Sequence, residues 1–420
     1  MRQRRPSSQA RTPGPVIRPV IAPVIRTVIR TVIVPVIVPV IRPVTRPLLR
    51  TVFGPVIGIV AALVLAACSA GDPAPASIAS PATGPAATRP ASPAAPGAGR
   101  AAPAGSVTIT AVGDMMLGNT PDLAPDPGTY FRAVKPALSR GAQIVFGNLE
   151  GTLTTATASK CGSANGGTCF AFRNPPAYAR YFRRAGFTIL NDANNHSFDF
   201  GAAGQAQTVR AIHAAGLAQT GLPGQVTRLR VAGITVAFVG FAPYRWAASL
   251  LDRAAARTLV RRAARQAELV VVYMHAGAEG SDADHVTGRD EHYLGEDRGN
   301  AEAFAHMAID AGASLVIASG PHVLRGLQFY KGHLIAYSLG NFAGYGNFSI
   351  HGDLAVSAIL RVRLSASGRL ERARLYPTQF AGPGRPVPGG GAIAFTARLS
   401  AEDFGASAAR IRPSGVIEAP

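Results

Sequence analysis

The chain has 420 residues, a net charge of +19 and three cysteines. Residues 1–105 hold twelve arginines and one acidic residue, Asp72, so more than half of the positive charge lies in the part least suited to a core. Because this basic part has neither interleaved aromatic residues nor a nucleic-acid motif, we expect no nucleic acid as a partner. The residues from 106 onward suffice for one sizeable hydrophobic core.

Residues 1–51 form a low-complexity basic segment built from tetrads such as Val-Ile-Arg-Pro. A period of four with frequent proline fits neither a helix nor an alternating strand, so we expect a disordered segment. The alternative is translated repeat DNA upstream of the true start. A start near Val44 would leave a short basic stretch before the next element.

Residues 52–68 read as a lipoprotein signal. An apolar run follows basic residues and ends in Leu-Ala-Ala-Cys at Cys68, which resembles a bacterial lipobox. We expect cleavage before Cys68, lipidation of Cys68, and anchoring on the outer face of the cytoplasmic membrane. An uncleaved anchor helix is the alternative, and it also places the rest outside the cytoplasm. Residues 69–105 are mostly Ala, Pro, Gly, Ser and Thr, which predicts a flexible tether.

The folded part is expected to span residues 106–376, followed by an extension over 377–420 that carries no motif. Apolar and amphipathic patterns predict alternating strands and helices first and strand pairs later. This order indicates an α/β domain with a mixed sheet or two stacked sheets. The expected strands are 107–112, 143–147, 187–190, 226–231, 234–240, 268–274, 314–318, 327–330, 333–337, 354–364 and 369–376; the expected helices are 129–140, 176–185, 202–215, 247–267 and 300–311.

Cys161 and Cys169 lie in one glycine-rich stretch. In an exported domain, two cysteines in one loop predict a disulfide. A two-cysteine metal half-site is the alternative, although the chain has no Cys-x-x-Cys pair.

The stretch from Asn191 to Asp199 follows a predicted strand and contains Asn195 and His196. In open α/β sheets, ligands bind at the carboxyl ends of strands. A dense run of such groups is costly to bury without partners, so we take it as the centre of a site. The alternative is an Asx-rich turn that caps the next helix.

Other predicted strands also end in polar groups. Oxygen ligands together with imidazoles suit a divalent metal such as Mn, Zn or Fe, which can activate water or polarise a phosphoryl or acyl oxygen. The polar strand ends contain Asp114, Asn148, Glu150, His275, Glu279, His322 and Asn341.

Several segments carry a family resemblance: AVGDMMLG, FGNLEGTL, FRNPP, NDANNHSFDFG, YMHAGAEG and SGPHVLRGLQFYKGHLIAYSLGNF. The chain resembles the CapA family of capsule (poly-γ-glutamate) synthesis proteins. The resemblance implies an α/β (α+β) fold, a four-layer αββα sandwich similar to calcineurin-like metallophosphoesterases. It also implies a role in making, anchoring or releasing an anionic surface polymer.

The resemblance assigns roles by position. Asp114, Glu150, Asn195, His275 and His322 would be metal ligands, with Glu150 at the place of a bridging carboxylate. His196 would be the general acid and Asp199 would orient its loop. Asn148, Glu279 and Asn341 would line the pocket.

The chain departs from the two-metal pattern at three places. Met116 stands where a histidine is expected, Ala276 where an aromatic residue is usual, and Gly320 where the last motif often has histidine. One ion, or a carboxylate pocket without metal, fits these residues better than a complete pair. His285, His292 and His306 lie in or near residues 281–297, which we expect to be a mobile rim loop, and we do not expect them to be ligands.

Two functions remain open. The first is a metal-dependent hydrolase or transferase acting on a surface polymer or phosphoester, with His196 as the acid. The second is a non-catalytic accessory that binds the polymer and organises membrane synthase subunits. A solute receptor would need two similar lobes, and no internal duplication follows residue 106.

Overall fold

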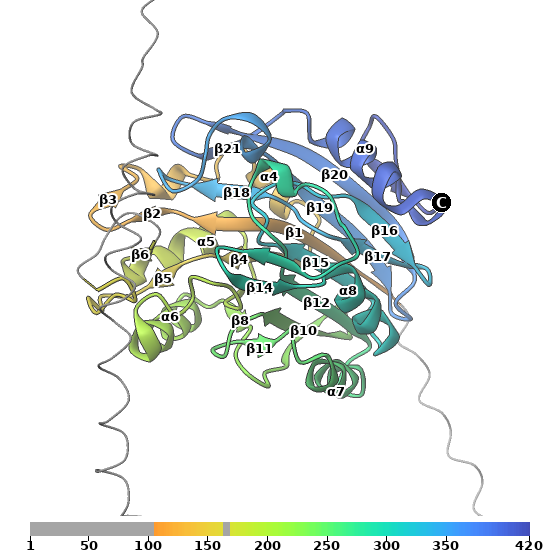
Figure 1. Cartoon of the computed structure of the whole chain (residues 1–420), viewed down its shortest axis with the longest axis horizontal. Helices are drawn as coiled ribbons and strands as arrows, with labels where there is room; N and C mark the ends of the chain where they lie inside the picture. Colours follow the sequence, from red (N-terminus) through yellow and green to blue (C-terminus); the bar gives the residue numbers. More distant parts are fainter. Residues whose placement is uncertain (1–104, 163–168) are drawn as a thin grey trace, which may run out of the picture. The chain divides into compact units, whose positions relative to one another are not determined.

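The computed structural model describes residues 105–162 and 169–420 (Figure 1). The expectations for residues 1–104, including the lipidated Cys68, lie outside the described residues. Within the described part, two stacked sheets have helices on their outer faces, which confirms the four-layer α/β sandwich.

The first sheet has ten strands in the described part, in the order β22-β23-β20-β19-β1-β4-β7-β8, with β18 beside β1 and β21 beside β20. Strands β1, β4, β7 and β8 are parallel, while β19 runs antiparallel to β1. Their bounds are β1 Ser106–Met116, β4 Ile144–Leu149, β7 Ile189–Asn191, β8 Ala218–Thr220, β18 Asn341–Gly344, β19 Val356–Ser365, β20 Leu370–Ala381, β21 Arg385–Pro388, β22 Arg410–Ile411 and β23 Val416–Glu418.

The second sheet has seven described strands in the order β11-β10-β12-β15-β17-β16, with β9 beside β10. Strands β10, β12, β15 and β17 are parallel to one another. Their bounds are β9 Thr227–Val231, β10 Ile234–Ala242, β11 Ala248–Ser249, β12 Leu269–His275, β15 Leu315–Ser319, β16 Leu327–Tyr330 and β17 His333–Ala336.

The main core lies between the two sheets. Ile109 of β1 and Phe146 of β4 face Phe238 of β10 and Val271 of β12, and the rings of Phe146 and Phe238 stack 5.8 Å apart. Alternate residues of the same strands face the helices, so both sides of each central strand are apolar. Each such buried side chain contributes about 1.5–3 kcal/mol.

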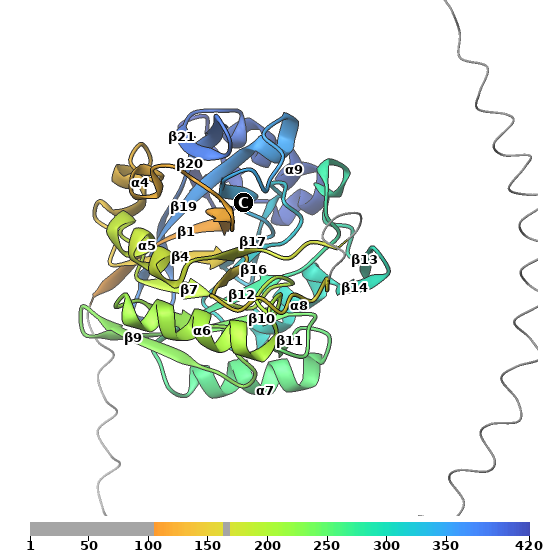
Figure 2. The same ribbon diagram turned by 90° about the vertical axis from the view of Figure 1, so that its left-hand side faces the viewer.

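The outer layers are helical. Leu138, Phe182 and Ile212 pack on the first sheet, and Val260 and Phe304 pack on the second. Figure 2 shows α4 and α5 beside β1 and β4, with α6 and α7 below them. The α-helices are α4 Lys135–Ser139, α5 Ala179–Ala185, α6 Gly201–Ala214, α7 Arg253–Ala264, α8 Ala301–Asp310 and α9 Ala392–Phe404. No helix in the described residues is long and apolar enough to cross a bilayer.

Short elements connect the layers. The strand pairs β2 Gly118–Asn119 with β3 Asp122–Leu123, β5 Thr152–Leu153 with β6 Arg173–Asn174, and β13 Glu291–Tyr293 with β14 Glu296–Gly299 stand apart from the main sheets. The 3₁₀ helices are η2 Pro127–Thr129, η3 Pro176–Tyr178, η4 Ser281–Ala283, η5 Gly352–Ala355 and η6 Gly405–Ser407.

The helix predicted over 129–140 is wrong in length, since α4 begins only at Lys135. Pro136 lacks the N–H that would bond to the Arg132 carbonyl and its ring crowds that carbonyl, so Pro136 is tolerated in the first turn of a helix but a regular helix cannot run through it from Thr129. The preceding residues form turns instead.

Residues 377–420 are packed into the same sheet. Strand β20 runs across position 376, β23 pairs with β20, and α9 places Ala392 in the core between the sheets. The chain after 376 therefore completes one edge of the first sheet.

Candidate metal centre

Polar strand ends from both sheets meet at one place. Asp114 lies near the end of β1, Glu150 follows β4, His275 ends β12, and His322 follows β15. Asp114, Glu150 and His275 are fully buried. Because β1 runs parallel to β4 and β12 runs parallel to β15, the carboxyl ends of these strands share an edge in each sheet, and the stacking of the sheets brings the two edges together.

Asp114 is held from three sides. Its Oδ1 accepts hydrogen bonds from Asn148 Nδ2, at 2.7 Å, and from the Ser319 hydroxyl. Its Oδ2 accepts from the Gly320 amide at 3.2 Å. The carboxylate is thus fixed by Asn148 of its own sheet and by Ser319 and Gly320 at the end of β15 in the second sheet.

Glu150 is the unusual member of the cluster. Both of its carboxylate oxygens are buried, and neither accepts a hydrogen bond from any described residue. Its Oε1 lies 3.7 Å from His275 Nε2 and 3.5 Å from His322 Nε2. A buried carboxylate without partners is costly, so this arrangement calls for a cation.

His275 has its ring oriented by a chain of hydroxyls. Its Nδ1 lies 3.2 Å from the Tyr273 hydroxyl, which lies 2.5 Å from Ser319 Oγ. When Ser319 donates to Asp114 and Tyr273 donates to Ser319, Nδ1–H of His275 must donate to Tyr273. The lone pair of Nε2 then faces Glu150, and Nε2 has no hydrogen-bond partner among the described residues.

A hydrogen bond at Nδ1 also orients the ring of His322. Its Nδ1 donates to Asn341 Oδ1 at 2.8 Å, because an amide oxygen can only accept, and Nε2 is directed toward Glu150, where it would offer its lone pair to an ion once it has lost its proton. Its backbone φ is +63°, a left-handed conformation that costs about 1–3 kcal/mol in a residue other than glycine. Gly320, with φ of +120°, makes the tight turn that precedes it.

Without a metal ion, protons on Glu150 and His322 offset the negative charge of the carboxyl groups in the cluster. Burial lowers the pKa of His275 to about 3. Burial also opposes the charge on His322, but Glu150, Asp114 and Glu279 raise its pKa to about 10. Burial, together with the charge of Asp114, raises the pKa of Glu150 well above its usual value. Burial raises the pKa of Asp114, but hydrogen bonding from His322 and the charges of both histidines bring it below its usual value.

The donors fit a divalent metal. Ligand atoms of Asp114, Glu150 and His322 lie within 4.8 Å of one another, and His275 reaches the same Glu150 oxygen. Two carboxylates and two imidazoles suit Mn, Zn or Fe. The second nitrogen of each imidazole already has an orienting partner, as metal-bound histidines usually do.

His196 and Asp199 form a pair beside this cluster. His196 Nδ1 lies 2.9 Å from Asp199 Oδ2, which leaves Nε2 free toward the pocket. Asp199 also accepts from the Phe172 amide at 2.7 Å and pairs with Lys160 at 2.7 Å. Lys160 and Phe172 flank the Cys161–Cys169 disulfide in the sequence, and the predicted bridge is confirmed.

Asn195 and Glu279 connect the pair to the metal cluster. Asn195 Nδ2 donates to Glu279 Oε1 at 3.4 Å, and its buried Oδ1 has no partner among the described residues. Glu279 also pairs with Arg298 at 2.8 Å, and its Oε2 lies 3.6 Å from His322 Nε2.

Two adjoining hollows, of about 250 Å³ and about 370 Å³, open on the site and share His196, Glu279, Phe170 and Tyr293. Asn341 lines the first hollow, as expected. Asn148 does not line either; it lies behind Asp114 and orients it.

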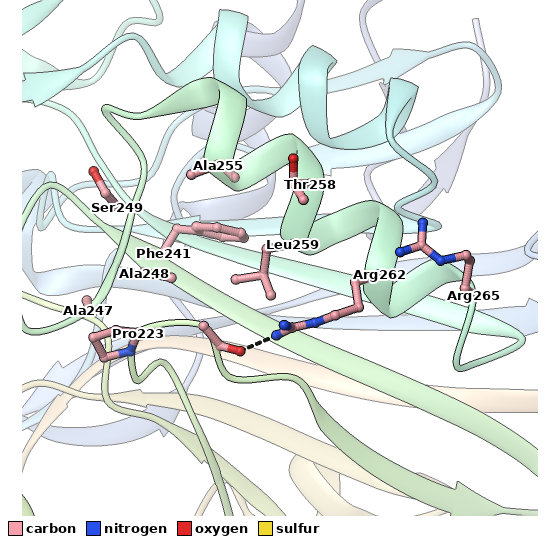
Figure 3. A pocket seen from close by; sticks show the side chains of 12 residues that line it. Pro223, Phe241, Ala247, Ala248, Ser249, Ala255, Thr258, Leu259, Arg262 and Arg265 are labelled. Atoms are coloured by element: carbon pink, nitrogen blue, oxygen red, sulfur yellow. Dashed lines mark hydrogen bonds between the residues drawn. The ribbon is translucent and has the colours of Figure 1, made fainter. Parts of the chain in front are cut away.

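A separate hollow of about 410 Å³ lies between α7 and the strands β10 and β11 (Figure 3). Phe241 and Leu259 form its floor and Arg262 closes one side with a hydrogen bond to the Gly224 carbonyl. It shares no residue with the polar cluster.

Sequence reasoning did not single out Tyr273, Lys160 or Arg298. Tyr273 stands two residues before His275, so strand alternation already placed both on one face. Lys160 and Arg298 reach the site through contacts distant in sequence, and no local signal marks them.

The segment 281–297 differs from the expected mobile loop. It contains η4 and the β13–β14 pair, and Glu291 forms a two-pronged ion pair with the buried Arg325. His285 contacts Asp403 and His306 contacts Gln328, so neither is near the cluster's ligand atoms.

The fold and the site define a class: a two-sheet α/β protein with a carboxylate–imidazole centre at the strand ends. Residues 108–345 match the family model described as bacterial capsule synthesis protein PGA_cap. This match covers more than half of the chain, and the chain belongs to that family.

Its relatives carry related names. It is 29% identical over 259 residues to the capsule biosynthesis protein CapA of Bacillus anthracis, covering 56% of this chain and 59% of that protein. It is 26% identical to the PGA biosynthesis protein CapA of Bacillus subtilis (strain 168), covering 55% of this chain and 61% of that one. The chain thus spans about three fifths of the length of these relatives.

Solved structures show a looser likeness. A protein described as a 5'-nucleotidase of Staphylococcus aureus aligns with a TM-score of 0.40 and 12% identity, covering 68% of this chain and 54% of that one. A purple acid phosphatase from yellow lupin aligns with a TM-score of 0.35 and 9% identity, covering 68% and 54%. These alignments carry no inference about function.

Proposed function

We propose that this protein is an extracytoplasmic, metal-dependent hydrolase or transferase that acts on an anionic cell-surface polymer of the poly-γ-glutamate kind. The observation that carries the proposal is Glu150, a buried carboxyl group without a hydrogen-bond partner among the described residues that faces the Nε2 atoms of two oriented imidazoles. The names of the relatives supply the polymer class.

In this proposal Asp114, Glu150, His275 and His322 hold the ion, with Asn195 offering its free Oδ1. The bound ion would lower the pKa of a water ligand and polarise an acyl or phosphoryl oxygen. His196 donates a proton from Nε2 to the leaving group, and Asp199 stabilises the charged imidazole through Nδ1. Asn148 and Tyr273 keep Asp114 and His275 in place.

The proposal includes membrane attachment through Cys68 and the segment 69–105. Its support is the lipobox-like sequence alone, since these residues lie outside the described part. Attachment would keep the domain beside membrane synthase subunits and the growing polymer.

The test compares polymer made in cells that carry only a His196→Ala variant with polymer made by cells with the unchanged protein. Loss of a general acid lowers the rate about 10²–10⁴-fold, so polymer amount or chain length should change as in a deletion. The exposed His213→Ala on α6 is the matched control and should behave like the unchanged protein. Polymer that stays normal with His196→Ala would refute the catalytic role.

A non-catalytic accessory role is the second candidate, and Met116 favours it. Met116 is buried at the place where a two-metal centre would have histidine, and it lines the first hollow. A relative from Mycobacterium tuberculosis, 27% identical over 219 residues, is itself named a probable polyglutamine synthesis accessory protein. Under this role, Asp114→Ala and His275→Ala would leave polymer binding and polymer length unchanged.

A further inference from the structure

Strands β19 and β20 carry four arginines that face each other in register. Arg361 of β19 lies directly opposite Arg374 of β20, and Arg363 lies opposite Arg372. The intervening residues, such as Val362, are buried between the sheets, so strand alternation places all four arginines on the outward face. Like charges directly opposite on neighbouring strands destabilise a sheet, so this arrangement has a cost.

Acidic residues neutralise only part of the positive charge of the four arginines. Arg363 pairs with Glu371 at 2.9 Å, whereas Arg372 is exposed and forms no ion pair with any described residue. Arg361 and Arg374 lie over the ring of Tyr376, with guanidinium carbons 5.1 Å and 5.4 Å from its centre. Tyr376 thus holds two of the positive charges side by side.

These residues line a hollow of about 660 Å³ that extends from β1 across β19 and β20 to β23. Glu371 and Glu418 are its acidic residues, and each is already paired with an arginine. The hollow therefore offers net positive charge over several strands, on the sheet that Figure 1 shows in orange and blue.

We propose that this arginine groove (Arg361, Arg363, Arg372 and Arg374 around Tyr376) binds a linear polymer with repeated carboxylate groups. The exposed Arg363 and Arg372 can pair with carboxylates in a fork-like manner, and a bound polyanion would relieve the repulsion across the strands. Arg361 and Arg374 donate to the Ala137 and Ser414 carbonyls and add positive charge beside them. An elongated groove fits a chain better than a flat lipid surface. The inference rests on the proposed function for the identity of the polymer, but it places polymer binding at a second location.

The groove is separate from the metal centre. Thr108 lines the groove and Asp114 belongs to the metal centre, and both lie on β1. Six residues of extended strand span about 20 Å. A long polymer bound in the groove could therefore extend along the protein and react at the metal centre, away from the point where it is bound.

The experiment measures binding of fluorescently labelled poly-γ-glutamate to the purified full-length protein by anisotropy, at low and at high salt. The Arg363→Gln/Arg372→Gln double variant should bind at least about tenfold more weakly, because each charge-assisted contact is worth more than a neutral one. Its melting temperature should stay the same or rise. The double variant Arg257→Gln/Arg261→Gln on α7 removes the same charge and should bind like the unchanged protein.

The possible results distinguish the arginine-groove proposal from the proposed function of the metal centre. Unchanged affinity in Arg363→Gln/Arg372→Gln would overturn the groove while leaving the proposed function intact. Equal losses in the groove and α7 variants would also overturn it, since net charge alone would then explain binding. If the unchanged protein binds inorganic polyphosphate but not poly-γ-glutamate, the carboxylate assignment is wrong. If Asp114→Asn abolishes binding and the groove variant does not, the polymer is held at the metal centre instead.

Discussion

Individual residues at the metal centre have separate duties. In the proposed centre, Asp114 and Glu150 are the carboxylate ligands and His275 and His322 the imidazole ligands. Asn148 and Ser319 orient Asp114, Tyr273 orients His275, and Asn341 orients His322. The left-handed His322 is consistent with this division, since strain in the backbone places its ring between the carboxylates.

Tyr273→Phe tests the orienting role. The substitution removes the hydroxyl that fixes His275 Nδ1, so His275 can rotate or change tautomer. We expect affinity for Mn²⁺ to fall about 10–100-fold, as for other orienting partners of metal ligands, with little change in fold. Titration calorimetry gives the affinity, and circular dichroism serves as the folding check. Unchanged affinity would show that Tyr273 is a core residue only.

At the scale of elements, much of the fold follows from local sequence. The turns at Ala232-Gly233 and Lys331-Gly332 have positive φ at both positions, the turn type that favours tight hairpins, and the sequence predicts the strands on both sides of each turn. Polar strand ends likewise predicted which residues would converge. Contacts between distant segments were not predictable, because nothing near Glu291 indicates that it meets Arg325.

The Glu291–Arg325 pair explains why segment 281–297 is ordered. Arg325 is fully buried, donates twice to Glu291, and donates to the Ala283 carbonyl. Breaking such a buried pair typically costs about 3–5 kcal/mol. Glu279 and Arg298, which flank this segment on either side, are therefore joined by residues that are fixed to Arg325.

A second contact fixes the same segment to α9 and makes its stability depend on pH. The hydrogen bond from His285 to Asp403, aided by the nearby Asp284 and Glu402, raises the pKa of His285 above the usual histidine value of about 6.5. The protonated form is thus favoured in the folded state. The stabilisation is complete below pH 6.5 and is lost as the pH rises through the folded-state pKa.

His285→Gln should remove this dependence. His285 is 47% exposed, so we expect its contribution to be below about 1 kcal/mol. Urea unfolding at about pH 6 and about pH 9 should show a smaller change in the free energy of unfolding for the variant than for the unchanged protein. His292→Gln, also exposed, is the control. A variant whose pH dependence equals that of the unchanged protein would contradict the assignment.

For the whole molecule, the parallel and the antiparallel strands contribute to different sites around one core. The parallel strands of both sheets bring ligands to a shared edge, while the antiparallel strands β19 and β20 present the arginine groove on an outer face. Residues 377–420 complete the sheet that carries the groove, which gives a structural reason for the part of the chain without motifs.

The central claim is that Asp114, Glu150, His275 and His322 bind a divalent cation, and calorimetric titration of the metal-free protein with Mn²⁺ tests it most directly. We predict saturable binding of one or two ions, with an affinity more than about a hundredfold weaker in Glu150→Gln and unchanged in the exposed control Glu371→Gln. At about a hundred times Kd, Mn²⁺ should also raise the free energy of unfolding by about 2.7 kcal/mol. No binding by the unchanged protein, or equal binding by Glu150→Gln, would contradict the account.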